Sequence, residues 1–299
     1  MTILSGIMVT IGVCVRNCSS TVGRAIESIM AQDYPHELME VIFVDDGSED
    51  ETLSIIKGYA SKMDMKVKIF HHEWQGLGFT RNVVVKNASG KYIIWLDGDM
   101  ALPKDFVRKQ LEFIERDPKI GVVGGKPALH LKGNLVTVLE NIVPVAYRIK
   151  YGKQAKNLPG TGGSIFRVEA IRHVGGFDEH IKGSGEDIDV ICRIKTAGWL
   201  VYRDYAVFYE GYEDTWKKLW NKYFWHGYGG HYFFHKNRSV AKIYGMVPPI
   251  SFFVGLFFSS VAYKITRKKV FFLLPFHYAF KRTAWCLGFI KAHFDNYGH

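Results

Sequence analysis

The chain has 299 residues, of which 47% are hydrophobic and 23% are charged, so a disordered or low-complexity protein is excluded. Four cysteines without a CxxC pair argue against a disulfide scaffold and a zinc cage, and favour a reducing compartment. The net charge of +10 is unevenly spread, because residues 216–299 carry thirteen Lys or Arg and one acid, whereas residues 1–215 carry a net charge of −2. A basic, aromatic-rich tail beside a near-neutral body indicates an anionic membrane surface as partner, and no nucleic acid.

The first fifteen residues are apolar but have no basic segment before them, and the first basic residue is Arg16. A secretory signal peptide needs such a segment. We therefore expect no signal peptide and a body that stays in the cytoplasm.

The first half of the chain alternates short apolar runs with segments of helical periodicity. Val- and Ile-rich runs predict buried strands, and apolar residues spaced three and four apart predict helices. We expect strands at 7–15, 41–44, 66–70, 92–96 and 120–123, and helices at 21–32, 51–61, 74–87 and 103–115. Strands that alternate with helices predict an α/β fold with a mostly parallel sheet.

After residue 121 the pattern is less regular. We expect a helix at 134–150, a flexible loop at 160–163, a short strand at 164–167, a short helix that ends at Gly175 and Gly176, and a helix at 186–196. The predicted organisation is a catalytic domain at 1–215 and a helical tail at 216–299.

Acidic clusters follow two of the expected strands, at Asp45-Asp46 and at Asp97-Gly98-Asp99. Parallel sheets bind ligands at the carboxyl ends of their strands. Carboxylate oxygens at a strand end suit Mg²⁺ or Mn²⁺, which bridge a protein to a diphosphate. A lone D-x-D is as often a solvated turn, and an Asp after a strand can instead cap the next helix, but the apolar strand at 92–96 directs this pair to the ligand edge.

Glu186 and Asp187 stand at the start of a predicted helix, after a Gly-Ser-Gly loop. Acidic residues favour the first helical turn for electrostatic reasons alone. A carboxylate at the edge of a loop also suits a general base for a hydroxyl nucleophile.

Other motifs carry less weight. The segment 76–81 imitates a dinucleotide-binding fingerprint, but Arg81 stands at its third Gly position and the loop does not follow its strand directly. No P-loop and no G-x-S-x-G motif occurs. The histidines at 226, 231 and 235 lack an obvious ligand spacing, so we interpret them as interfacial or core residues.

Taken together, the segments over residues 7–225 resemble the family 2 glycosyltransferases of GT-A fold. Residues 44–50 resemble the nucleotide-binding V-D-D-G-S-x-D, residues 78–82 the G-x-x-x-A-R-N stretch, and residues 92–99 the strand that ends in D-x-D. Residues 175–178 and 185–189 resemble the G-G-F-D-E and E-D motifs. Their order and spacing make the combination specific.

The resemblance implies an inverting transfer of a sugar from a nucleotide-sugar donor, with Mg²⁺ or Mn²⁺ as cofactor. Asp187 is the implied base that deprotonates the acceptor hydroxyl. Implied donor contacts are Asn17, Asp45, Asp46, Arg81, Asp97 and Gly98; implied metal ligands are Asp97, Asp99 and Glu210; and the implied acceptor region comprises Gly162, Gly163, Ser164, Glu186 and Trp225.

Two positions depart from the family pattern. Where the family often has a His after a late strand, this chain has Glu210, which can still ligate a hard cation. Of the Q-x-x-R-W motif of processive synthases only Trp225 remains, so we expect no processive synthesis.

The tail contains 21 uncharged residues, 243–263, which as a helix would measure about 31 Å, near a bilayer core. Basic residues flank it on both sides, against the positive-inside tendency for one crossing. The next apolar run, 270–280, is too short to span. Re-entrant or in-plane helices on the cytoplasmic face of the membrane are therefore favoured over spans, with a soluble core helix pair as the alternative.

The leading hypothesis is a metal-dependent, membrane-associated glycosyltransferase that acts on a lipid-linked or glycan acceptor. Two alternatives remain. A nucleotidyltransferase of related fold would resemble G-x-G-x-R near the N-terminus, which residues 11–17 lack, and a catalytically dead membrane adaptor is disfavoured by intact Asp97, Asp99 and Asp187.

Overall fold

The computed structural model describes residues 6–129, 131–151, 158–181, 184–211, 214–237 and 246–297. These residues form two compact units, described separately below. Unit 1 lies within 1–128, 158–182 and 186–211, and unit 2 within 129–157, 183–185 and 212–299. The sequence predicts a domain division after residue 215, which places 129–157 in the first domain, whereas the structure groups the described residues of this segment with the C-terminal helices.

Unit 1 is built on a seven-stranded sheet with strand order β3-β2-β1-β4-β7-β5-β8. Pairs β3–β2, β2–β1, β1–β4 and β5–β8 are parallel, and β7 runs antiparallel between β4 and β5. The strands are β1 (Val9–Val15), β2 (Met39–Asp46), β3 (Lys66–His72), β4 (Tyr92–Asp97), β5 (Ile120–Val123), β7 (Ile165–Arg167) and β8 (Leu200–Tyr202); a separate pair joins β6 (Lys126–Pro127) and β9 (Val207–Phe208). The mostly parallel α/β sheet is confirmed.

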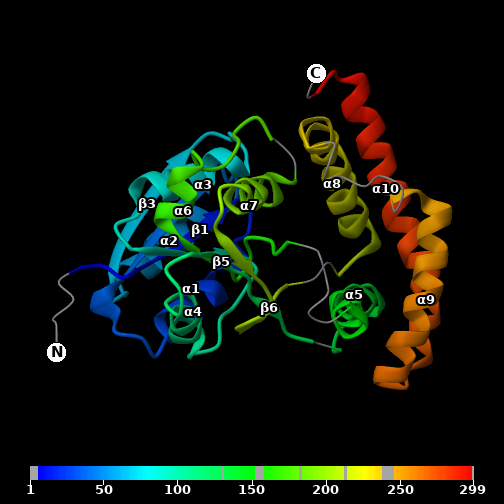
Figure 1. Ribbon diagram of the computed structural model, residues 1–299, viewed down its shortest axis with the longest axis horizontal. Coiled ribbons are helices and arrows are strands. Elements are labelled where there is room, and N and C mark those ends of the chain that lie inside the picture. The colour runs from blue at the N-terminus through cyan, green and yellow to red at the C-terminus, as the bar shows by residue number, and fades with distance from the viewer. Residues whose placement is uncertain are drawn as a thin grey trace. The chain divides into compact units, whose positions relative to one another are not determined.

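Helices cover both faces of this sheet (Figure 1). The helices and turns of unit 1 are α1 (Val22–Met30), η1 (His36–Leu38), α2 (Thr52–Ala60), α3 (Leu77–Asn87), α4 (Phe106–Ile114), α6 (Val168–His173) and α7 (Glu186–Thr196). All predicted helices of this unit are present, with ends shifted by a few residues. The short strands β6, β8 and β9 were not predicted, because two or three residues are too few to show a period.

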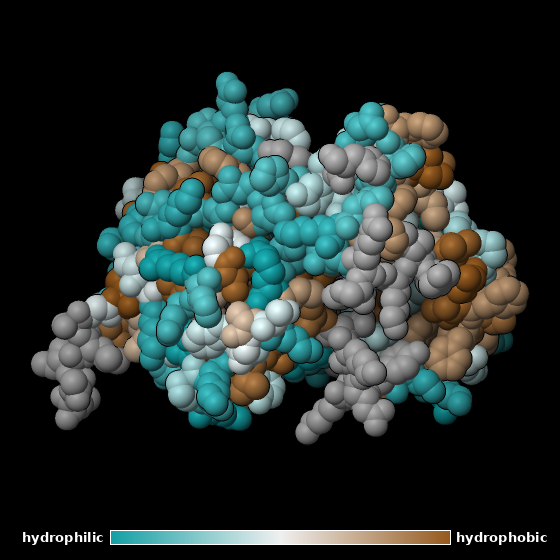
Figure 2. All heavy atoms as spheres, turned by 45° about the horizontal axis from the view of Figure 1, so that its top comes forward, coloured by the Kyte–Doolittle hydropathy of each residue, from teal (hydrophilic) through white to brown (hydrophobic). Residues whose placement is uncertain are grey.

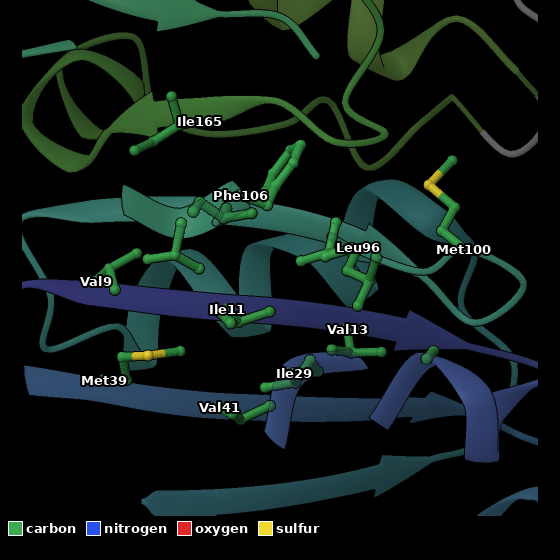
Figure 3. Close-up of a cluster of buried hydrophobic side chains, with 14 of the residues drawn as sticks. Val9, Ile11, Val13, Ile29, Met39, Val41, Leu96, Met100, Phe106 and Ile165 are labelled. Atoms are coloured by element: carbon green, nitrogen blue, oxygen red, sulfur yellow. The ribbon is translucent and has the colours of Figure 1, made fainter. Parts of the chain in front are cut away.

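Alternation along the strands divides the core into two clusters. Val9, Ile11 and Val13 on β1 point to the face covered by α1, α2 and α4, as the close-up in Figure 3 shows for β1, β2 and their neighbours. Cys14 on β1 and Trp95 on β4 point to the opposite face, covered by α3, α6 and α7. Because both faces are buried, these strands are mostly apolar. The exceptions on β1 and β2 include Thr10, whose hydroxyl donates to Glu40 Oε1 at 2.7 Å.

Unit 2 is helical and contains α5 (Leu135–Tyr151), α8 (Trp216–Lys236), α9 (Pro248–Thr266), η4 (Lys269–Leu273) and α10 (Leu274–Phe294). Its core joins apolar residues of α5, α9 and α10, among them Leu139, Ile142, Phe258 and Leu274. This shared core explains why α5 groups with the tail. Figure 2 shows hydrophobic side chains gathered on the surface of the C-terminal helices.

One helix among the described residues, Pro248–Thr266, is long and apolar enough to cross a membrane. Residues 238–245, which include Arg238, Lys242 and the first three residues of the uncharged stretch, lie outside the described residues.

Candidate active site

Strand register brings the predicted donor-binding carboxylates to one edge of the sheet. Val15, the last residue of β1, pairs with Asp45 on β2, and Cys14 pairs with Asp97 on β4. Asp45 and Asp97 therefore lie at the carboxyl ends of the two strands that flank β1. This is the carboxyl edge at which parallel sheets bind ligands.

The carboxylates of Asp45 and Asp46 are both buried and hold the loops around this edge. Asp45 accepts hydrogen bonds from the Ser48 hydroxyl and the Ser48 N–H, and its Oδ2 lies 2.8 Å from His71 Nδ1. Asp46 accepts from the N–H groups of Gln75, at 2.7 Å, and Gly76, at 3.1 Å. Both carboxylates thus shape the edge of the site, while their direct contact with a nucleotide stays a prediction.

Asn17 links the loops that follow β1 and β2. Its N–H donates to Ser48 Oγ at 2.9 Å, and its Oδ1 accepts from the Glu49 N–H at 2.8 Å. Its φ of 49° lies in the left-handed region, which Asn tolerates better than most residues. Asn17 is exposed, so it stands at the open side of the predicted donor site.

The D-x-D segment begins with Asp97, the last residue of β4. The Asp97 side chain is 37% exposed, and the Asp99 carbonyl oxygen accepts from Arg24 Nη2 at 2.7 Å. Gly98 was expected to permit a turn. The structure gives a different reason for glycine here, because a Cβ would lie 2.7 Å from Cys18 Sγ, while its φ is not in the left-handed region.

Glu210 lies beside this segment in the backbone. Tyr209 forms an antiparallel bridge with Ala101, and the Gly211 N–H donates to the Asp99 carbonyl at 3.1 Å. Glu210 is the residue between these two attachment points. Its assignment as a metal ligand remains a prediction.

Arg81 is a buried cation that joins two of the acidic motifs. Its Nη1 donates to Glu186 Oε1, and its Nη2 lies 3.6 Å from Asp97 Oδ1. The guanidinium also lies over the Phe177 ring, 5.6 Å from its centroid. Because both Arg81 and Glu186 are buried, the Glu186 carboxylate that contacts Arg81 is not open to solvent.

Asp187 is more accessible than its neighbour and faces the turn 160–164. A Cβ on Gly160 would lie 3.1 Å from Asp187 Oδ2, whereas a Cβ on Gly162 would lie 3.4 Å from Asp97 Oδ2 and 2.5 Å from Met100 Cε. One glycine-rich turn therefore lies against both the D-x-D carboxylate and Asp187. A side chain at Gly160 or Gly162 would crowd one of them.

The turn is fixed to the sheet by hydrogen bonds. Ser164 O accepts from the Trp95 N–H, and the Gly163 N–H donates to Trp95 O, both at 3.0 Å. Ser164 Oγ donates to Gly160 O at 2.5 Å, and Gln110 Nε2 donates to Gly163 O at 2.7 Å. Gly162, Gly163 and Ser164 are thus held beside the end of β4, and their role at a donor–acceptor junction stays a prediction.

Sequence reasoning missed two residues of this arrangement. The sequence predicts Gly160 only as part of a flexible loop. Gln110 is fully buried on α4, and the signal that could have found it is a polar residue in the middle of the helix's apolar stripe, between Val107 and Leu111.

Burial raises the pKa of the Asp187 carboxyl, Asp97 adds to this effect, and the positive charge of Arg81 partly opposes it. The pKa of Glu186 is also raised by burial, with the same opposition from Arg81. A carboxylate with a raised pKa is a stronger base than an exposed Asp, which suits Asp187 to proton abstraction.

Among the described residues no three His, Cys, Asp or Glu side chains are grouped closely enough to hold a metal ion by themselves. This includes His226, His231 and His235; His231 is buried on α8 with its ring 4.5 Å from that of His235. Trp225 lies on α8 in unit 2 and is 43% exposed, so its acceptor role stays a prediction.

A family model, "Glycosyl transferase family 2", matches residues 10–175, more than half of the chain. The chain belongs to glycosyl transferase family 2. It is therefore a glycosyltransferase, and the predicted family is confirmed.

Curated relatives include poly-beta-1,6-N-acetyl-D-glucosamine synthases. The protein of Staphylococcus epidermidis is 27% identical over 65% of this chain and 46% of its own length, and that of Staphylococcus aureus strain COL is 27% identical over 72% and 52%. The chain spans about half the length of these curated relatives.

Solved structures confirm the GT-A type of fold. A mannosyltransferase from Pyrobaculum calidifontis, in complex with GDP-Man and Mn²⁺, matches 98% of this chain and 88% of its own, with a TM-score of 0.67 and 17% identity. S. aureus TarS 1-349 matches 97% and 92%, with a TM-score of 0.54 and 19% identity.

Proposed function

We propose that this glycosyltransferase moves one sugar, with inversion, from a nucleoside diphosphate sugar to a hydroxyl of a lipid-linked or glycan acceptor at the cytoplasmic face of the membrane. The turn 160–164 carries the proposal. It places glycines against Asp97 on one side and Asp187 on the other, so a donor held at the D-x-D edge would present its anomeric carbon near a carboxylate base.

The donor class is supported by the similar solved structures. The P. calidifontis mannosyltransferase is complexed with GDP-Man, and TarS 1-349 with UDP-GlcNAc. In this chain Asn17, Asp45 and Asp46 shape the edge at which the nucleotide would bind. The two neighbours differ in base and sugar, so both stay open here.

The residues present fit a divalent cation. Asp97 offers a partly exposed carboxylate, Asp99 follows at two residues, and the backbone of Glu210 lies beside Asp99. Oxygen ligands of this kind, completed by phosphate oxygens of a donor, suit Mg²⁺ or Mn²⁺. When bound, the ion supplies positive charge against the departing diphosphate.

The residues of this chain supply the remaining chemistry. Asp187 accepts the proton of the acceptor hydroxyl as the oxygen attacks the anomeric carbon. The bond between that carbon and the diphosphate oxygen breaks, and its electron pair leaves with the diphosphate, towards Arg81. Glu186 acts as a positioning residue, because its carboxylate is bonded to buried Arg81.

Nucleotide-sugar turnover tests the proposal. The purified protein is screened against UDP-, GDP- and other nucleotide-linked sugars with Mn²⁺, with Mg²⁺ and with EDTA. We expect one donor to be hydrolysed slowly without acceptor and faster with one. Asp187→Asn should lower transfer roughly 10²–10⁴-fold, the usual contribution of a general base, while donor affinity is retained.

Asp105→Asn is the matched control, because Asp105 is a carboxylate outside the site that pairs with Lys109. Its turnover should equal that of the wild type. Release of pyrophosphate from a nucleoside triphosphate and a sugar phosphate would instead reveal a nucleotidyltransferase, and no turnover with any donor would support an adaptor. Loss of donor binding in Asp187→Asn would remove the base assignment.

A further inference from the structure

Helix α9 is built the opposite way from a helix of a water-soluble core. The side chains it buries are mostly small or polar, including Ser251, Gly255 and Ser259. Its exposed face carries large apolar residues at helical spacing, namely Ile250, Phe253, Leu256 and Phe257. Burial of apolar area drives folding in water. In α9 the largest apolar side chains instead stay exposed.

Helix α10 buries two charged or titratable side chains beside apolar ones such as Leu274, Tyr278 and Trp285, while other large apolar side chains stay exposed. Its buried face holds His277 and Lys281, whose side chains contact buried Glu140 of α5; His277 Nε2 lies 3.2 Å from Glu140 Oε1. Phe276, the residue next to His277, is 65% exposed. The exposed apolar residues of η4 and α10 are Phe272, Leu273, Phe276, Leu287, Ile290 and Phe294.

The outward faces of α9 and the η4–α10 segment form one surface. The rings of Phe252 and Phe276 lie 5.4 Å apart, and those of Tyr263 and Phe272 also 5.4 Å apart. We call this surface, with Ile250, Phe253, Leu256, Phe257, Phe272 and Phe276 as its exposed members, the apolar face. Figure 2 shows apolar side chains over this part of unit 2. Exposed apolar patches of this kind mark interaction sites.

Charge identifies the partner. The last turn of α9, the start of η4 and the two residues between them carry Lys264, Arg267, Lys268 and Lys269, which are all exposed. We call these four residues the basic turn. No Asp or Glu occurs between residues 215 and 294. A wide apolar face beside a cluster of cations complements a bilayer that contains anionic lipids.

Spanning fits the structure poorly. Helix α9 has 19 residues, about 28 Å at ~1.5 Å per residue. It packs against α10 near Phe258 and Tyr278, whose rings lie 6.1 Å apart. If α9 crossed the bilayer, its partner would carry Lys281 and Arg282 close to the hydrocarbon centre, where charged residues are costly.

We propose that the apolar face docks in the plane of an anionic bilayer, so that α9 and the η4–α10 segment enter one leaflet from the side of the basic turn and do not cross. This inference rests on the proposed function, in which the protein acts at a membrane, and it adds which surface binds the membrane. Insertion of such a face reaches about 5–10 Å into the interface.

Vesicle flotation tests the surface and its lipid class. The full chain in dilute detergent is mixed with vesicles of phosphatidylcholine alone or with about one third phosphatidylglycerol, and the bound fraction is measured. We expect at least tenfold tighter binding to the anionic vesicles and loss of that difference in high salt. Phe253→Gln with Phe276→Gln should weaken binding at least tenfold.

The matched control changes two other exposed apolar residues, Leu129→Gln and Leu200→Gln, which lie off the apolar face. It should bind like the wild type. Asp187→Asn should also bind like the wild type, so that failure of the transfer chemistry and failure of docking are distinguished. Equal binding to both vesicle types, or no effect of the two Phe changes, would overturn the proposal.

Protease access tests the in-plane arrangement. Trypsin is added outside sealed vesicles to which the protein has bound from outside, and cleavage is compared at Lys236, before α9, and at Lys268, after it. We expect trypsin to cut the vesicle-bound protein at both sites, as it does the protein in detergent. Protection of one end only would show a span, and vesicle-independent self-association abolished by the two Phe changes would assign the face to a second copy of this chain.

Discussion

At the scale of single residues, the division of labour between Glu186 and Asp187 follows from burial. Adjacent residues in a helix point about 100° apart, so only one of the two can face a given partner. Glu186 is directed at buried Arg81, and Asp187 is directed at the turn that holds Gly160. The sequence left the choice to family resemblance; the structure adds that the two carboxylates have different partners, and the role of Asp187 as base stays a prediction.

The raised pKa of Asp187 predicts a pH dependence. A base acts only when deprotonated, so the turnover number should fall as pH decreases through this pKa, about tenfold per pH unit below it. Because burial raises the pKa, the fall should begin at a higher pH than for an exposed Asp. The turnover number is measured against pH at saturating donor.

The residual turnover number of Asp187→Asn should not fall as pH decreases, whereas that of Asp105→Asn should fall as in the wild type. If the turnover number of Asp187→Asn falls with decreasing pH as in the wild type, the titrating group is another residue.

The buried pair of Arg81 and Glu186 predicts a stability effect. Glu186→Gln removes the main partner of a buried guanidinium, and breaking a buried ion pair typically costs about 3–5 kcal/mol. The free energy of unfolding is measured with urea. Arg108→Ala, at an exposed pair with Asp33, is the control and should change the free energy of unfolding little. If Glu186→Gln lowers the free energy of unfolding no more than Arg108→Ala does, the buried pair of Arg81 and Glu186 is not formed.

At the scale of elements, α8 and α10 pack backbone against backbone. A Cβ on Gly227 of α8 would lie 1.9 Å from Trp285 O, and a Cβ on Gly288 of α10 would lie 2.0 Å from Phe224 O. Each of these glycines therefore allows the main chain of the other helix to approach closely. Nothing in the sequence periodicity marked them, because their role depends on the neighbouring helix.

This packing predicts that Gly227→Ala separates α8 from α10 and destabilises the protein. Overpacking usually costs about 1–3 kcal/mol, and the clash here is with main-chain atoms that cannot rotate away. Thermal unfolding measures the change. Gly58→Ala is the control, because a Cβ there meets nothing within 4 Å, and Ala stabilises a helix interior by about 0.5–1 kcal/mol relative to Gly. Equal effects of the two changes would contradict the close packing.

At the scale of the whole molecule, ligand linkage tests the predicted metal site. A ligand that binds only the folded state stabilises it by about 2.7 kcal/mol at 100 times its Kd. We expect Mn²⁺ together with GDP or UDP to raise Tm, and EDTA to abolish the rise. Asp99→Asn should remove the metal-dependent part while its Tm without ligand stays close to that of the wild type.

Asp204→Asn, at an Asp paired with neighbouring Arg203, should keep the full metal-dependent rise. The same rise in Asp99→Asn would place the cation elsewhere.

Much of unit 1 could be predicted from the sequence because its information is local. Both faces of β1, β2 and β4 are buried, so each strand is mostly apolar, and Asp45 and Asp97 are marked by their place directly after apolar runs. Helix periodicity located α1, α2, α3 and α4 to within a few residues. The order of motifs was sufficient to identify the family.

Only the tertiary structure decided which segments that are distant in the sequence contact one another. The pairing of β7 between β4 and β5 puts the turn 160–164 beside Asp97, and residues more than sixty positions apart then share one site. The buried partner of Glu186, the hold of Gln110 on Gly163, and the grouping of α5 with the tail depend on the same folding. The physical reason is that periodicity reports which face of an element is buried, whereas only the packed chain reports against which other residues it is buried.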